Sequence, residues 1–294
     1  MKTTLKNNLL TVSIDSFGAE VHSITDNATG HEFLWCGDKK YWGRHSPVLF
    51  PVVGRVWEGH YRLDGHEYSL GQHGFARDRE FELIPDTPDD EVWFALESSD
   101  DTLALFPRRF RLEIGYKLYE ARLSVIWRVK NLDDKDMPFH IGAHPAFNYP
   151  DYNAADAVHG YLCFDSRTVT SEILADSGCV TGGEAAVELD TEGMIPLDAH
   201  TFDKLKTIII DKGQVRRVSM LNKNREAYLT MLFNAPLVGI WSPSTDAPFV
   251  CIEPWWGRCD REGFNGDFTE REYTNIIAPG ETFEASYMIL FDRI

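Results

Sequence analysis

Cysteine is scarce in this 294-residue chain, and its distribution excludes two kinds of small stabilised fold. The cysteines are odd in number, widely scattered and without a C-x-x-C pair, so neither a disulfide framework nor a zinc knuckle is indicated. We therefore expect free thiols in a reducing compartment. The five residues concerned are Cys36, Cys163, Cys179, Cys251 and Cys259.

Positive charge is also in short supply. The chain has 46 acidic residues against 29 Lys and Arg, which gives a net charge of −17. The longest basic runs are the pairs Arg108–Arg109 and Arg216–Arg217. Because a protein that follows phosphates needs a basic stripe, we expect neither nucleic acid nor an anionic membrane surface as a partner.

Long apolar runs are missing as well. No segment approaches the about 18 apolar residues of a membrane helix. Residues 1–8 lack the apolar stretch of a signal peptide. The sequence thus predicts a cytoplasmic protein without a membrane anchor.

Helical periodicity is rare, and strand periodicity dominates. Apolar residues occupy every second position in 110–118, 123–129 and 283–291. This period of two, with one apolar face, is typical of half-buried strands. Tyr61–Leu70 predicts a hairpin, because Asp64-Gly65 supplies the positive φ angles of a tight turn.

The organisation of the chain favours one large β domain. A single helical turn is expected at Asp203–Leu205, and we find no linker, internal repeat or low-complexity tract. Many short strands separated by turns are typical of a sandwich. We predict an all-β fold, a large antiparallel β-sandwich with few short helices, that forms a single domain over residues 1–294.

Two segments in the first third of the chain break the alternation. Arg55 stands alone among prolines, a glycine and apolar residues, and its planar donor fork suits hydroxyl, carboxylate or phosphate groups. An arginine at a strand end, paired with a carboxylate, is the alternative. His73 is followed by Gly74, which lets the backbone approach a ligand closely, although a structural histidine has the same pattern.

Two later segments contain titratable residues in apolar surroundings. His144 ends a strand and can exchange protons near its ordinary pKa of about 6.5. His140 lies about 13 Å from it along an extended strand, so we interpret His140 as structural. Glu253 lies between four apolar residues and Trp255, where burial would raise its pKa, as in many general bases. The alternative is an aromatic core with a glutamate at a turn.

Five motifs in order resemble the aldose 1-epimerase (galactose mutarotase-like) family, in its LacX-like branch. They are Phe-Pro-x-x-Gly54-Arg55, His73-Gly-Phe-Ala-Arg77, Gly-x-His144-Pro-x-Phe-Asn148, Ile-Trp241-Ser and Ile-Glu253-Pro-Trp-Trp-Gly257. The resemblance implies a β-sandwich with an open sugar-binding cleft and an isomerase that needs neither cofactor nor metal. It implies Glu253 as general base and His144 as general acid, with His73, Arg55, Arg77, Trp255 and Trp241 binding the substrate. The family's further aspartate is not assigned, because residues 201–208 match poorly.

The chemistry of anomer exchange fits these roles. The hemiacetal must open, rotate about C1–C2 and close on the opposite face, so one group removes the anomeric proton while another protonates the ring oxygen. Glu253 must then be ionised while His144 is protonated. We expect mutual attraction to raise the pKa of His144 and lower that of Glu253. A bell-shaped pH–rate profile follows, and a flat one through neutral pH would contradict the pair.

Three alternatives remain open. His73, His144 and Glu253 form a two-histidine, one-carboxylate set that suits a metal-dependent enzyme. A non-catalytic sugar-binding protein would have the same lining. The substrate of a hexose-6-phosphate 1-epimerase would need phosphate ligands, for which Arg44, Arg77 and Arg79 are candidates. The expected partner is a small-molecule aldose, either a hexose or a hexose phosphate, bound by a monomer or homodimer.

Overall fold

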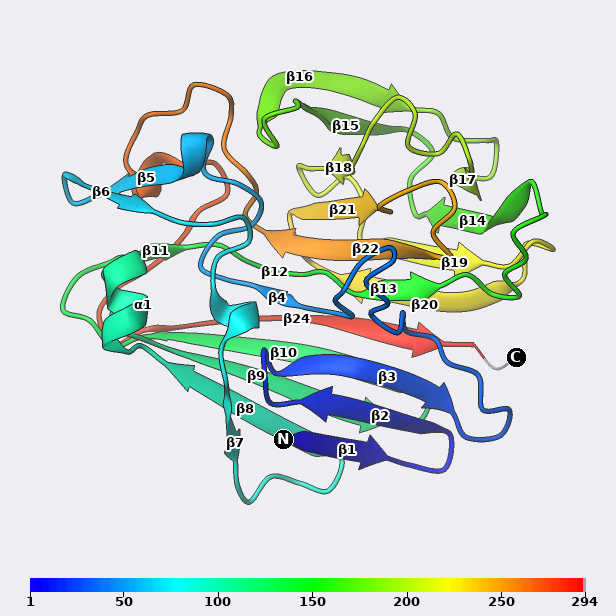
Figure 1. Ribbon diagram of the computed structural model, residues 1–294, viewed down its shortest axis with the longest axis horizontal. Coiled ribbons are helices and arrows are strands. Elements are labelled where there is room, and N and C mark those ends of the chain that lie inside the picture. Colours follow the sequence, from blue (N-terminus) through cyan, green and yellow to red (C-terminus); the bar gives the residue numbers. More distant parts are fainter. Residues whose placement is uncertain (293–294) are drawn as a thin grey trace.

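Two large antiparallel sheets make up most of the computed structural model, which describes residues 1–292 (Figure 1). One sheet has nine strands in the order β17-β14-β19-β20-β24-β10-β9-β8-β7. Its strands are β7 (Glu82–Ile84), β8 (Glu91–Glu97), β9 (Phe110–Tyr119), β10 (Arg122–Asn131), β14 (Val158–Phe164), β17 (Met194–Asp198), β19 (Arg217–Leu221), β20 (Ala227–Phe233) and β24 (Thr282–Phe291).

The other sheet has eight strands in the order β16-β15-β18-β21-β22-β12-β4, with β13 also paired to β22. Its strands are β4 (Val48–Leu49), β12 (Ile141–Ala143), β13 (Ala146–Asn148), β15 (Val169–Leu174), β16 (Val180–Val187), β18 (Ile208–Ile210), β21 (Leu237–Trp241) and β22 (Phe249–Trp256). In this sheet β22 pairs with both β21 and β12, which gives it a central position.

Smaller sheets and short helices complete the described part of the chain. The three-stranded sheet is β1 (Lys2–Lys6), β2 (Leu10–Asp15) and β3 (Glu20–Asp26), and the two-stranded sheets are β5 (His60–Leu63) with β6 (His66–Ser69) and β11 (Met137–Phe139) with β23 (Asn275–Ile277). The helices are α1 (Asp100–Leu105) and the 3-10 turns η1 (Trp57–Gly59), η2 (Ala76–Asp78) and η3 (Phe268–Glu270).

The predicted fold class is confirmed, and so are the strands that carried it. The three alternating segments form β9, β10 and β24, which are neighbours in the nine-stranded sheet. The expected hairpin is β5–β6, and Asp64 and Gly65 have φ angles of 54° and 77° at its turn. The expected helical turn at Asp203–Leu205 is wrong, because Asp203 and Lys204 form a bend and Leu205 has no regular structure. The helix α1 was not anticipated, and a hydrogen bond from Ser99 N–H to Thr102 Oγ1 holds its first turn.

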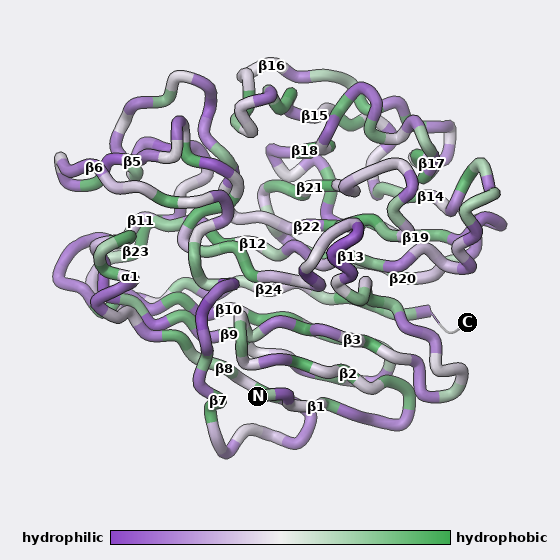
Figure 2. The backbone as a smooth tube through the Cα atoms, in the orientation of Figure 1, coloured by the Kyte–Doolittle hydropathy of each residue, from purple (hydrophilic) through white to green (hydrophobic). Residues whose placement is uncertain are grey.

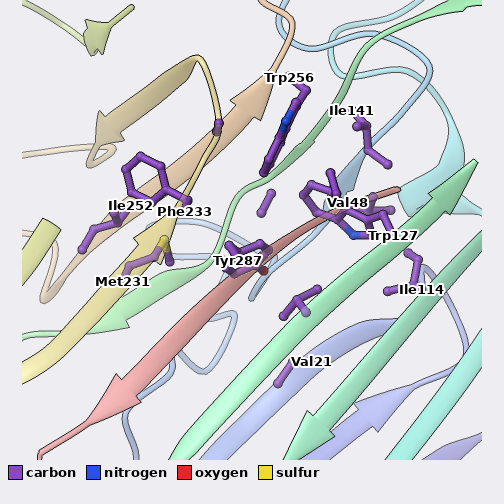
Figure 3. Close-up of a cluster of buried hydrophobic side chains, with 14 of the residues drawn as sticks. Val21, Val48, Ile114, Trp127, Ile141, Met231, Phe233, Ile252, Trp256 and Tyr287 are labelled. Atoms are coloured by element: carbon purple, nitrogen blue, oxygen red, sulfur yellow. The ribbon is translucent and has the colours of Figure 1, made fainter. Parts of the chain in front are cut away.

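The core lies between the two large sheets (Figure 3). Trp127 of β10 meets Trp256 of β22 edge to face, with ring centroids 5.6 Å apart. Ile252 of β22 and Tyr287 of β24 belong to the same cluster. Figure 2 shows hydrophobic positions recurring along these strands and hydrophilic positions in the connecting loops. No helix among residues 1–292 has the length and apolar character needed to cross a membrane.

Candidate active site

The site is built on the face of β22 that points away from this core. Every residue of β22 is buried, so the strand shows no alternation of polarity in its burial. Strand geometry nevertheless separates the two faces, because successive side chains point in opposite directions. Ile252 and Trp256 join the main core, which places Glu253 and Trp255 on the opposite face.

Two glycines on neighbouring strands make room for Trp255. A β-carbon added to Gly239 of β21 would lie 2.5 Å from the indole, and one added to Gly142 of β12 would lie 2.7 Å from it. The indole therefore lies across the backbone of both strands. It forms part of the floor of a cleft beside Glu253.

This cleft has a volume of about 380 Å³ and takes residues from distant parts of the chain. Six of the seven site residues expected from the sequence line it, the exception being Arg55. The lining consists of Trp42, Arg44, Gly54, Gln72, His73, Arg77, His144, Leu174, Gly178, Thr207, Ile209, Trp241, Glu253, Trp255 and Cys259.

Glu253 and His144 lie in direct contact at the bottom of the cleft. The distance from His144 Nε2 to Glu253 Oε2 is 3.3 Å, and the carboxylate is 1% exposed. The two groups therefore lie side by side. Adjacent groups suit this chemistry, because the anomeric oxygen and the ring oxygen are both bonded to C1.

Burial shifts the pKa of both groups, as expected for Glu253 from its apolar surroundings and against the shifts expected from mutual attraction of the pair. It raises the pKa of Glu253 well above its ordinary value. It also lowers the pKa of His144 to about 3, with help from the positive charges of Arg77 and Arg44. Both shifts favour the neutral forms, because desolvation outweighs the mutual attraction of an ion pair.

Several buried polar atoms around the pair lack hydrogen-bond partners among the described residues. They include Glu253 Oε2, His144 Nδ1, Trp255 Nε1 and Arg77 Nε. An unsatisfied buried polar atom costs about 1–3 kcal/mol. Their concentration in one cleft is typical of a site that satisfies them with a polar ligand.

His73 is held by two hydrogen bonds to the backbone of Gly54. His73 N–H donates to Gly54 O at 2.8 Å, and Gly54 N–H donates to His73 Nδ1 at 3.1 Å. The ring meets His144 edge to face, with centroids 5.6 Å apart. Gly74 is required next in the chain, since a β-carbon there would lie 2.2 Å from Phe50 O at a φ of +70°. These contacts fix the first two motifs against each other.

The arginines divide into two groups. Arg77 and Arg44 line the cleft, where Arg77 Nη2 donates to Gln72 O at 2.7 Å and Arg44 Nη2 lies 2.8 Å from Asp78 Oδ1. Arg55 is exposed outside the lining, and its Nε donates to Gln72 Oε1 at 3.3 Å. Arg79 also lies outside, 3.8 Å from Asp101, which leaves Arg44 and Arg77 as the candidates for binding an anionic group.

Trp42 is an aromatic residue of the cleft lining that the sequence analysis did not single out. Its ring stacks on His144 with centroids 4.7 Å apart and an interplanar angle of 26°. It also meets Trp241 edge to face, with centroids 5.8 Å apart. The signal that was available is the aromatic pair Tyr41-Trp42 just before Arg44, in a segment without alternation.

Comparison with known proteins identifies the family. Residues 1–272 match the family described as Aldose 1-epimerase. The chain belongs to the aldose 1-epimerase family. It is 28% identical to "Protein LacX, chromosomal" of Lactococcus lactis subsp. lactis, covering 98% of this chain and 99% of that one.

Solved structures agree with this assignment to the aldose 1-epimerase family. A galactose mutarotase related enzyme from Lactobacillus acidophilus superposes with a TM-score of 0.92 at 31% identity, covering 100% of this chain and 98% of that one. A galactose mutarotase-like protein from Lactobacillus casei ATCC 334 gives a TM-score of 0.91 at 28% identity, covering 99% and 100%. The resemblance stated from the motifs is confirmed.

Two of the sequence-based questions about this epimerase-family site have structural answers. His140 lies outside the lining, fully buried, with Nε2 3.1 Å from Thr274 Oγ1, as expected for a structural histidine. The unassigned aspartate has no counterpart in the cleft, where Glu253 is the only carboxylate among the described lining residues. Asp203 is exposed beside His200.

The metal-enzyme alternative does not match the observed geometry. Among the described residues, the group at the Glu253–His144 pair whose ligand atoms lie within 4.8 Å of one another is His144, Cys251 and Glu253. It does not include His73, and Cys251 lies outside the cleft lining. The two-histidine, one-carboxylate set proposed from the sequence is therefore not assembled around one point.

Proposed function

We propose that this protein is an aldose 1-epimerase that interconverts the α and β anomers of an aldose. The observation that carries the proposal is the contact between Glu253 and His144 at the bottom of a polar and aromatic cleft. Trp42 and Trp241 form an aromatic wall beside the pair, and tryptophan faces suit the C–H surfaces of a sugar ring. The motifs that match the family contain both titratable residues.

The pair needs one proton in total. Ring opening removes the proton of the anomeric hydroxyl while the ring oxygen gains one, and closure reverses both transfers. With Glu253 ionised and His144 protonated, the glutamate is the base and the histidine the acid. With Glu253 protonated and His144 neutral, the roles are exchanged. Both forms contain the same number of protons, so either supports the complete cycle.

The charges around the pair support this reaction. Arg77 and Arg44 place positive charge beside the histidine, where it stabilises negative charge developing on a sugar oxygen. Because no electron, phosphoryl or acyl group moves, the steps above require only proton transfers by side chains of this chain.

The test is anomerisation of freshly dissolved α-glucose and α-galactose, followed by polarimetry or NMR over the spontaneous rate. Glu253→Gln and His144→Asn should each lower kcat by about 10²–10⁴-fold, the usual contribution of a positioned proton transfer. The matched controls are Glu172→Gln and His159→Asn, which alter buried residues outside the lining that also have an unpartnered ring nitrogen or carboxylate oxygen. Sugar binding without acceleration by the wild-type protein would favour a non-catalytic binding protein.

A phosphorylated substrate is the second candidate, favoured by Arg44 and Arg77 in the cleft. A dianionic phosphate would bind guanidinium groups through charge-assisted hydrogen bonds. Glucose 6-phosphate should then compete against glucose. Arg44→Gln should weaken the binding of the phosphate ester more than the binding of the free sugar. An equal loss of affinity for both substrates would assign Arg44 to hydroxyl binding alone.

A further inference from the structure

A second group of titratable side chains lies outside the sugar cleft, at the base of the connection between β3 and β4. Glu20 and His22 are two positions apart on β3, beside a register shift in its pairing with β2, and their side chains lie close together. His45 comes from residues 36–47 of the connection, part of the blue trace between β3 and β4 in Figure 1. The ligand atoms of these three residues all lie within 4.8 Å of one another.

Glu20 is fixed in place by the connection it faces. Its Oε1 accepts hydrogen bonds from His45 N–H at 2.7 Å and Ser46 N–H at 2.8 Å. Its Oε2 lies 3.9 Å from His22 Nε2, and His45 Nδ1 lies 3.8 Å from Oε1. One carboxylate thus faces a ring nitrogen of each histidine.

The two imidazoles stack on each other. Their centroids are 4.0 Å apart and the rings are inclined by 13°. Burial and the neighbouring His45 lower the pKa of His22, against the opposing charges of Glu20 and Asp15. Backbone N–H groups help to hold the pKa of Glu20 low despite its burial. The group therefore brings together one carboxylate and two imidazoles, which are metal-binding side chains.

We propose that Glu20, His22 and His45 form a binding site for a divalent transition metal of the zinc class. Two imidazoles and one carboxylate are a zinc donor set, and imidazole also suits copper and nickel. Zinc binds such atoms at about 2.0–2.1 Å. The donors must therefore draw closer together and the rings must tilt out of their stack. His22 would make most of this movement, because its side chain is partly exposed, whereas Gly37 covers the ring of His45.

The metal would connect β3 to the segment that supplies the aromatic wall of the cleft. Trp42 and Arg44 line the cleft and lie within three residues of His45. A bond from the metal to His45 would fasten this segment to Glu20 and His22. The site is nevertheless distinct from the cleft, since none of its three residues belongs to the lining.

The experiment is equilibrium dialysis of the full chain against micromolar Zn²⁺ near neutral pH, with metal content measured by mass spectrometry. The wild-type protein should bind one equivalent. His22→Asn and His45→Asn should each weaken binding by more than about tenfold, the lower bound for losing even an outer partner of a metal ligand. Cys251→Ala and His159→Asn are the controls and should bind as the wild type does, and circular dichroism checks that each variant is folded.

The outcomes separate this site from the cleft. Loss of zinc in Cys251→Ala, with retention in both histidine variants, would place the metal at His144, Cys251 and Glu253 and overturn the proposal. Absence of a bound equivalent in the wild type would overturn it too.

Discussion

The protonation of His144 in the folded chain can be measured through its effect on stability. Burial lowers the pKa of this imidazole from 6.5 to about 3. The unfolded chain therefore binds one more proton than the folded chain between these two values. Since stability rises with pH wherever the unfolded state binds more protons, the contribution of His144 is present above about pH 6.5 and is lost as the pH falls towards its folded pKa.

The size of the effect follows from the same two pKa values. One pKa unit corresponds to about 1.36 kcal/mol. Between about pH 6.5 and pH 5 the folded ring stays neutral while the unfolded ring gains its proton. His144 should therefore account for a loss of about 2 kcal/mol in the free energy of unfolding.

The assay compares urea unfolding of the wild type and His144→Asn at both pH values. The variant should lose about 2 kcal/mol less than the wild type on acidification, because asparagine does not titrate. The comparison uses the pH dependence alone, so any constant cost of the substitution cancels. Equal losses in the two proteins would show that the folded and unfolded chains protonate His144 alike, which would refute the neutral histidine.

Two further predictions concern the architecture of the cleft. Gly74→Ala should destabilise the protein by more than the about 1–2 kcal/mol of a left-handed alanine, because its β-carbon would meet Phe50 O. Gly30→Ala, at a similar φ of +76° but in open space, is the matched control in urea unfolding. Trp42→Ala should raise the KM for sugar by about two- to tenfold, since an aromatic contact contributes about 0.5–1.5 kcal/mol. An unchanged KM would remove Trp42 from the substrate wall.

The sequence was sufficient for the fold class because the strands of the nine-stranded sheet are buried on one face. Leu123 and Val125 are core residues with partly buried neighbours, so their period of two is visible in the amino-acid sequence. The eight-stranded sheet gave no such signal, since β22 is buried on both faces. The motifs around Glu253 located that strand instead. The helix α1 was missed because six residues show no periodicity.

The site was predictable in its members but not in its electrostatics. His144 and Glu253 are 109 positions apart, and only the order of the motifs indicated that they belong together. The direction of their pKa shifts depends on how completely they are covered. Trp42 supplies part of that cover from a connection without a repeating pattern, where sequence spacing predicts no contact. Burial therefore opposes the expected ion pair, for a reason that only packing reveals.

The remaining question is which partner of the pair holds the proton during turnover, and Arg77 offers a way to answer it. The pair is active with one proton, so kcat/KM falls when it gains a second proton in acid and when it loses its only proton in alkali. If His144 is neutral, the acid limb follows its depressed pKa and the alkaline limb follows the raised pKa of Glu253. If His144 is the protonated partner, it governs the alkaline limb.

The charge of Arg77 lowers the pKa of His144. Arg77→Gln should therefore raise the pH midpoint of whichever limb belongs to the histidine. We expect the acid limb to move while the alkaline limb stays. Movement of the alkaline limb alone would show that His144 is the protonated partner. A rate without either limb would contradict the acid–base role of the pair.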